Sequence, residues 1–306
     1  MTDRSASQDR DHRPLPDKPH TLGDGPSESA RTEEAPLVLI RPRTGLLNVD
    51  PMELWHYRDL LYFLVRREVL VRYKQTVLGA AWAILQPLAG MIIFTIFFGK
   101  LAKMPSDGLP YPLFSYCGLL LWTFFAQAMN ESANSLVSNA NLVTKIYFPR
   151  LLMPVAPVIS SLLDLAIACS VLLGLMIYYG VPPSANIWAL PLMIAIAALA
   201  ACGVGTALSA LNVKYRDFRY VLPFLTQLWL FASPIVYPVS MVPEKWRLIY
   251  ALNPMAGAVE GFRWALLGAG TNPWPLVAVS ALSATAMLLV GIMHFKRTEN
   301  FFADLI

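Results

Sequence analysis

The sequence has few of the residues that catalytic and metal-binding sites require. It contains three cysteines and four histidines, and no two cysteines have the CxxC spacing of a metal or redox site. Cys117, Cys169 and Cys202 all lie inside apolar runs, which predicts small core side chains and no disulfide framework. Neither an HExxH pair nor a GxSxG turn occurs. We therefore expect no catalytic residue and no metal site.

Nucleotide and nucleic-acid binding are not indicated either. No GxxxxGK[ST] loop is present, so the chain has no phosphate-cradling motif of its own. Charged residues make up 14% of the sequence and hydrophobic residues 56%. The net charge of +4 does not point to nucleic acid, because membrane topology accounts better for the basic residues.

Long apolar runs dominate the remaining sequence. A helix of about 20 apolar residues crosses the hydrocarbon core of a bilayer. We predict an all-α integral membrane domain at 49–306 with six transmembrane helices, at 77–99, 113–129, 151–181, 187–211, 220–239 and 274–295.

The basic residues predict the orientation of these spans. With the N-terminus in the cytoplasm, nineteen of the 24 Lys and Arg lie in inside segments. The outside holds Lys100, Lys103, Lys245, Arg247 and Arg263. Cytoplasmic loops carry the excess of Lys and Arg, so both termini of this multi-pass protein are expected in the cytoplasm.

Two segments precede the first span. Residues 1–48 are rich in Asp, Arg, Pro, Ser and Glu, which predicts a disordered cytoplasmic extension, and they lack the apolar core of a signal peptide. Residues 53–75 predict an amphipathic helix in the headgroup plane, with Leu54, Tyr57, Leu60, Leu61, Leu64, Val65 and Val71 on its apolar arc.

Four basic residues near the end of this interface helix have two explanations. They are Arg66, Arg67, Arg72 and Lys74. Anionic lipid attracts such residues, which accounts for all four. Arg72, however, falls within the apolar arc, where a simple anchor would have a leucine. Its guanidinium is suited to bind a phosphate at the membrane surface.

The connection at 138–150, SNANLVTKIYFPR, differs from the apolar runs on either side. Val143, Ile146 and Tyr147 recur at i, i+3 and i+4, while Lys145 lies off that face. The pattern predicts either a short helix that docks into a groove on another protein or a tight turn between two spans. The charged connection at 212–220, NVKYRDFRY, fits lipid headgroup contact and a specific contact equally well.

The segment at 241–270 is too long and too apolar for a free loop. Asn253 is placed to cap a helix that begins at Pro254 and ends at Gly268. Because about 14 residues cannot span a bilayer, we expect a periplasmic re-entrant helical hairpin. Within the spans, Asp164 is the clearest ionisable residue. We expect it to face a helix contact or the conduit, and we favour a structural role over a proton relay.

Four motifs in this order carry a family resemblance: LLYFLVRREVLVRYKQTVLGAAWAILQP at 60–87, NANLVTKIYFPR at 139–150, LNVKYRDFRYVLPF at 211–224 and LNPMAGAVEGFRWALLG at 252–268. Residues 51–302 resemble the membrane subunit of an ABC-2 type polysaccharide exporter. The resemblance implies a permease of the bacterial inner membrane that acts in export of O-antigen (lipopolysaccharide biosynthesis), capsule or teichoic acid. It also implies a homodimer embedded in membrane lipids.

The partner implied by the resemblance is a cytoplasmic ABC ATPase in two copies, which would bind ATP and Mg. No cofactor is expected in this chain. The implied cargo is a lipid-linked glycan that enters through a lateral gate. The implied ATPase-coupling residues are Asn139, Asn141, Leu142, Val143, Lys145, Ile146, Tyr147 and Phe148, with Lys214, Tyr215, Arg216 and Asp217 as the second contact.

Further site candidates follow from the same resemblance. The four basic residues named above and the aromatic residues Tyr116, Trp122, Trp229 and Tyr237 are candidates for the gate and conduit, although tyrosine and tryptophan at span ends also anchor helices in the interface. Residues of the implied periplasmic gate helices are Asn253, Pro254, Glu260, Phe262 and Arg263.

Three alternative functions remain open from the sequence. An ABC-2 exporter of another amphipathic cargo would share these motifs. A secondary transporter would need a chain of ionisable groups inside the spans. A polytopic lipid-carrier glycosyltransferase would need paired carboxylates at a membrane face, and Asp107, Glu244 and Glu260 show no such pairing.

Overall fold

Helices make up the regular structure wherever the chain is described, as the sequence predicts. The computed structural model describes residues 51–74, 79, 81–145, 148–215, 217–268, 270, 272–299 and 302. All of them belong to one unit, 44–306. The predicted extension at 1–48 and its disorder lie outside the described residues.

Five helices of the described chain are long and apolar enough to cross a membrane. They are α3 (Ala81–Phe94) with the π-helix that continues it (Thr95–Leu101), α4 (Tyr111–Ser138), α6 (Leu152–Tyr179), α7 (Leu190–Lys214) with the 3₁₀ turn before it (Ala185–Ala189), and α11 (Trp274–Thr298). Their length and composition fit an integral membrane protein, and five of the six predicted spans have a counterpart among them.

The predicted span at 220–239 is not one continuous helix. Helix α8 covers Phe218–Phe231, and residues 232–238 after it are not helical. Pro234 and Pro238 lie in this stretch, and proline lacks the backbone N–H that a helix needs to continue. At 1.5 Å per residue, the 14 residues of α8 reach about 21 Å, less than the roughly 30 Å of a hydrocarbon core. Helix α8 alone is therefore too short to span, a crossing here would include the non-helical residues after it, and the sixth span remains a prediction.

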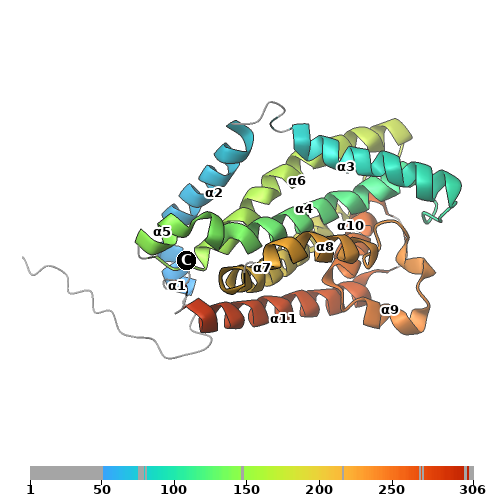
Figure 1. Cartoon of the computed structure of the whole chain (residues 1–306). Helices are drawn as coiled ribbons and strands as arrows, with labels where there is room; N and C mark the ends of the chain where they lie inside the picture. Colours follow the sequence, from blue (N-terminus) through green and yellow to red (C-terminus); the bar gives the residue numbers. More distant parts are fainter. Residues whose placement is uncertain are drawn as a thin grey trace, which may run out of the picture. The chain divides into compact units, whose positions relative to one another are not determined.

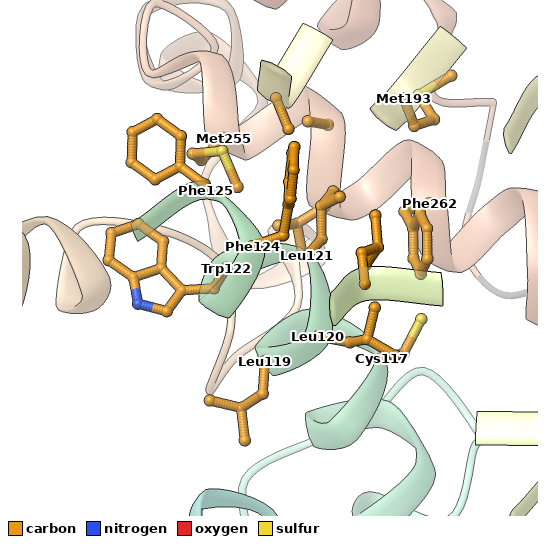
Figure 2. Packing of buried hydrophobic residues seen from close by; sticks show 14 of the residues in the cluster. Cys117, Leu119, Leu120, Leu121, Trp122, Phe124, Phe125, Met193, Met255 and Phe262 are labelled. Carbon is orange, nitrogen blue, oxygen red and sulfur yellow. The ribbon is translucent and has the colours of Figure 1, made fainter. Parts of the chain in front are cut away.

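Helix α4 lies at the centre of the main hydrophobic core. In its most apolar window 78% of the residues are buried, compared with 6% for α3. Side chains of α4 pack there with Met193 of α7 and with Met255 and Phe262 of α10 (Figure 2). The central position of α4 means that groups on its surface lie within reach of several other helices.

Glycines allow the helices around α4 to approach very closely. A Cβ atom at Gly291 of α11 would overlap the backbone of Gly203 of α7, and one at Gly205 of α7 would overlap Ser132 of α4. Such close backbone approach is typical of helix pairs in membranes. Helices α4, α7 and α11 therefore form a tightly packed body, whereas α3 makes much less contact with it.

The two ends of α4 carry different short helices (Figure 1). One end, called the α5 end below, has α1 (Pro51–His56), α2 (Arg58–Lys74) and α5 (Ala140–Lys145). The opposite end, called the α10 end, has α9 (Glu244–Tyr250) and α10 (Pro254–Leu267). A second hydrophobic cluster, which includes Leu64, Val143, Phe148 and Phe295, lies at the α5 end.

Helix α10 begins and ends as predicted. The Asn253 side chain accepts a hydrogen bond from the Met255 backbone N–H at 3.1 Å, and Gly268 ends the helix with a φ of 66°. All of its residues except Glu260 and Trp264 are buried. The cap prediction is confirmed. The side of the membrane on which α9 and α10 lie, and their description as a re-entrant hairpin, remain predictions.

The interface helix predicted at 53–75 is interrupted at Tyr57, which separates α1 from α2. Leu64 is buried on the predicted apolar arc, and neighbouring arc residues pack partly against the second cluster. Val71, on the same arc, is 56% exposed in the protein, and its position at the membrane interface remains a prediction. At that level Arg72 faces the other helices, so Val71, the preceding residue about 100° away on the helix, points outward.

Candidate functional site

Arg72 joins three helices through one guanidinium group. From the end of α2, its Nη1 donates to the Asp164 carboxylate of α6 and its Nη2 to the Glu131 carboxylate of α4. Ser160 Oγ lies 3.5 Å from Nη2. The planar fork of an arginine suits two carboxylates at once. Two helices of the bundle are thereby linked to the interface helix.

Asp164 receives further donors, which explains how a carboxylate is accommodated inside a span. Its exposed fraction is 7%. The Tyr73 hydroxyl donates to Oδ1, and Gln127 Nε2 donates to Oδ2 at 3.0 Å. Burial and the bond to Asp164 raise the pKa of the Tyr73 hydroxyl, which therefore remains a donor at physiological pH. The prediction that Asp164 lies at a helix contact is confirmed. Arg72, Tyr73, Gln127, Glu131 and Asp164 are called the Arg72 cluster below.

The Arg72 cluster forms part of the wall of a cavity of about 600 Å³. Residues from α2, α3, α4, α6 and α8 line it. Trp82 and Trp122 contribute aromatic rings, and Thr123, Asn130 and Gln227 contribute hydroxyl and amide groups. Ligand cavities in proteins have about this size and this combination of aromatic surface with a few polar groups.

The four aromatic residues predicted for the conduit have different surroundings. Trp122 lines the cavity. Tyr116 was a wrong choice, because it is fully buried and its hydroxyl donates to the Ala168 carbonyl at 3.1 Å, which makes it a packing contact between α4 and α6. Trp229 donates to Asn253 at 2.9 Å, and the hydroxyl groups of Tyr237 and Tyr250 lie 3.0 Å apart.

The four basic residues of α2 divide into two pairs. Arg72 belongs to the cluster described above, and Arg67 donates to Glu68 at 3.0 Å and to the Asn139 side chain. Arg66 and Lys74 are exposed. Arg67 and Arg72 therefore connect elements of the protein, whereas Arg66 and Lys74 lie at its surface. Helical periodicity did not distinguish these two pairs.

Two residues of the predicted coupling segment belong to the protein's own core. Val143 is 4% exposed and Phe148 5%, and both pack in the second hydrophobic cluster. Their assignment to a docking face was wrong, because the apolar face of this short helix closes the α5 end of the bundle. Periodicity identifies an apolar face but does not show whether the same chain or a partner covers it.

Other residues of the two predicted contact segments are exposed. They are Asn141 and Lys145 in α5, Lys214 at the end of α7, and Tyr215 and Asp217 after it, with Leu142 half-buried. The Lys214 ammonium lies 5.1 Å from the ring of Tyr215. Ile146, Tyr147 and Arg216 lie outside the described residues. Among the described residues, the remaining candidates for the predicted ATPase contact are therefore polar and aromatic groups at the surface.

We predict that Phe148→Ala destabilises the protein, whereas Lys145→Ala does not. Removal of a fully buried phenylalanine costs about 3–5 kcal/mol, because buried apolar surface is lost and a cavity remains. Lys145 is exposed and serves as the matched control on the same segment. The measurement is thermal unfolding of the purified variants in one detergent. A Phe148→Ala melting curve equal to that of Lys145→Ala would contradict the burial of this ring.

A second buried cation lies at the α10 end. Arg263 is 2% exposed and donates to the carbonyls of Phe114 at 3.3 Å, Pro234 at 2.6 Å and Ile235 at 2.8 Å. Its guanidinium lies 3.6 Å from the centre of the Phe114 ring, and Glu260 is 4.0 Å away. Burial lowers the pKa of Arg263, and the nearby Glu260 carboxylate opposes that shift. Arg263 thus joins α10 to the first turn of α4 and to the segment after α8.

Sequence reasoning missed several residues of the cavity wall. Glu131 and Gln127 are four residues apart on α4, and Tyr73 follows Arg72 in α2. One signal was present, because two polar residues one helical turn apart inside an apolar helix predict a polar contact. Their partners are separated from them by 37 to 91 residues, a range over which periodicity gives no information.

Comparison with known proteins places this arrangement in a family. Residues 59–267 match the model of the ABC-2 type transporter family. The chain is 29% identical over 253 residues to the O-antigen export system permease protein RfbA of Myxococcus xanthus, covering 81% of this chain and 96% of that protein. It is 27% identical over 249 residues to RfbA of Klebsiella pneumoniae, with coverages of 81% and 95%.

A capsule-type relative is similar over most of its length as well. The polysialic acid transport protein KpsM of Escherichia coli is 25% identical over 242 residues, covering 76% of this chain and 91% of that protein. The family match includes all of α2 except its first residue, the Arg72 cluster, α5 and α10. More than half of the chain is matched, and the chain therefore belongs to the ABC-2 type transporter family.

Proposed function

We propose that this chain is the permease subunit of an ATP-driven exporter that moves a lipid-linked polysaccharide across the bacterial inner membrane. One observation carries the proposal. The chain aligns with 96% of the length of an O-antigen export permease, without a long unmatched region of that relative in which a different activity could reside. The apolar helices and the polar, aromatic cavity among them fit a subunit that passes a glycan through a membrane.

The energy source in this proposal is a separate cytoplasmic ATPase. The sequence has no phosphate-binding loop, so ATP and Mg would be held by the partner, in two copies for a dimer of permeases. The exposed groups of α5, with Lys214, Tyr215 and Asp217, are the proposed contact surface. Val143 and Phe148 hold this segment against the bundle, because both are buried in the second hydrophobic cluster.

The proposed orientation follows from the distribution of basic residues. Both termini and the α5 end are placed in the cytoplasm, and α9 and α10 on the periplasmic side. Amphipathic α2 then lies at the cytoplasmic headgroup level, next to the cavity. A lipid-linked glycan that arrives in the inner leaflet would meet α2 and α3 first. A second copy of the chain completes the conduit in this proposal.

The test of this function is nucleotide hydrolysis. The purified chain alone should hydrolyse no ATP, and a complex with the partner ATPase should hydrolyse it. A control complex, in which the phosphate-binding lysine of the partner is replaced by alanine, should be inactive. Hydrolysis by this chain alone, or failure to form a complex with any ATPase, would contradict the proposal.

A further inference from the structure

The charges in the cavity wall do not balance. Arg72 is the sole Lys or Arg among the described residues that line the cavity, and Glu131 and Asp164 are its carboxylates. Arg72 is paired with both. When both carboxylates are ionised, one guanidinium leaves one negative charge uncompensated. In a partly buried site this charge is screened less by salt than it would be on an open surface.

The two carboxylates differ in how many donors they already accept. Asp164 accepts from Arg72, Tyr73 and Gln127 and is nearly fully buried. Glu131 accepts from Arg72 and, at 3.3 Å, from Gln127, and about a third of its side chain is exposed. An ionised carboxylate has about four acceptor positions. Glu131 therefore has acceptor capacity left, and it lines the cavity.

Hydroxyl groups of a sugar are suited to this wall. They donate to carboxylates and also accept from an amide such as that of Gln227. The apolar face of a sugar ring has the exposed ring of Trp82 in the same wall to pack against. A sugar that carries its own carboxylate would instead place a like charge near Glu131, which is unfavourable in a confined site.

We propose that this cavity binds an uncharged sugar residue of the exported glycan and discriminates against a sugar that bears a carboxylate. The inference rests on the proposed function for the identity of the ligand as cargo. It goes further in assigning the ligand class to the cavity and the discrimination to Glu131 and Asp164. A cavity of about 600 Å³ holds a ligand of sugar-unit size within the range of known small-molecule sites.

The experiment compares two probes that differ only in charge. A neutral hexose trisaccharide and the matching uronic-acid trisaccharide are titrated into the purified full-length chain in a zwitterionic detergent, with tryptophan fluorescence or calorimetry as the readout. The neutral probe should bind about tenfold more tightly, a difference of about 1.4 kcal/mol. The ratio of the two affinities should decrease as salt is raised from about 20 to about 500 mM, because salt screens the repulsion between like charges.

Two variants test whether the Glu131 and Asp164 carboxylates cause the discrimination between the two probes. Glu131→Gln keeps the Arg72–Asp164 pair and removes the excess charge, so the two probes should then bind about equally. Glu131→Gln combined with Asp164→Asn leaves Arg72 as the remaining charge, and the uronic probe should then bind more tightly. Glu299→Gln, which removes a carboxylate paired with Lys296 at the end of α11, is the matched control and should keep the tenfold ratio.

Equal binding of the two probes by the natural chain would overturn the inference, and so would binding of neither. An unchanged ratio in Glu131→Gln would overturn the assignment to the wall charges. None of these results bears on whether the chain forms a complex with an ATPase, so failure of the cavity inference and failure of the proposed function are distinguishable.

Discussion

Replacing Arg72 with alanine is expected to reduce export about tenfold or more, whereas Arg66→Ala leaves it within about twofold at equal amounts of folded protein. Arg72→Ala leaves Glu131 and Asp164 without their shared cation. Removing one partner of a buried ion pair lowers the free energy of unfolding by about 3–5 kcal/mol. We expect the lower end of this range here, because the Glu131 side chain is about a third exposed. Arg66 is exposed on the same helix and provides the matched control.

Two further variants separate the role of Arg72 from its charge alone. Arg72→Lys should restore export in part, because an ammonium keeps the charge but lacks the fork that reaches two carboxylates. Arg72→Ala combined with Glu131→Gln should be more stable than Arg72→Ala alone, because fewer unpaired charges remain. The readouts are glycan export in a strain that lacks the gene and thermal unfolding in detergent. Equal, small effects of Arg66→Ala and Arg72→Ala would instead indicate that this segment is a simple membrane anchor.

Replacing Arg263 with methionine is expected to lower stability by about 3–5 kcal/mol. Methionine is similar in length but donates no hydrogen bonds, so the carbonyls of Phe114, Pro234 and Ile235 would lose their donors inside the protein. The expected consequence is a much lower unfolding temperature, because α10 loses its connection to α4 and to the segment after α8. Thermal unfolding in detergent measures it.

Lys245→Met is the control for this substitution. It removes a cation from exposed α9 at the same end of the bundle and should leave the unfolding temperature nearly unchanged. Gly118→Ala provides an independent test, because a Cβ atom there would overlap the Arg263 guanidinium. It should destabilise the natural chain more than it destabilises Arg263→Met. Similar unfolding temperatures for Arg263→Met and Lys245→Met would contradict the structural role of Arg263.

The predictions that held depend on local sequence. The cap of α10 was predictable because Asn253, Pro254 and Gly268 act within one helical turn of the helix ends. Five of the spans were predictable because a bilayer sets the length of an apolar helix. Arg72 was identified as unusual because it is one of two charged residues, with Glu68, that fall within the apolar arc.

The predictions that failed depend on what covers a surface. Periodicity placed Val143 on an apolar face but did not show that residues of the same chain bury it. Tyr116 was chosen for its chemistry, and its burial between α4 and α6 follows from packing of distant segments. A continuous helix over 220–239 was wrong for a local reason, since Pro234 and Pro238 were visible signs that the helix could not continue. The partners of Arg72, 59 and 92 residues away, required the three-dimensional structure.

Transport by the reconstituted complex tests the central proposal most directly. The chain and its ATPase partner are placed in lipid vesicles, and movement of a lipid-linked glycan across the bilayer is followed with and without ATP. The proposal predicts ATP-dependent movement, lost when the phosphate-binding lysine of the partner is replaced and about tenfold slower with Arg72→Ala in this chain. Movement at the full rate without the ATPase, driven by an ion gradient, would contradict it.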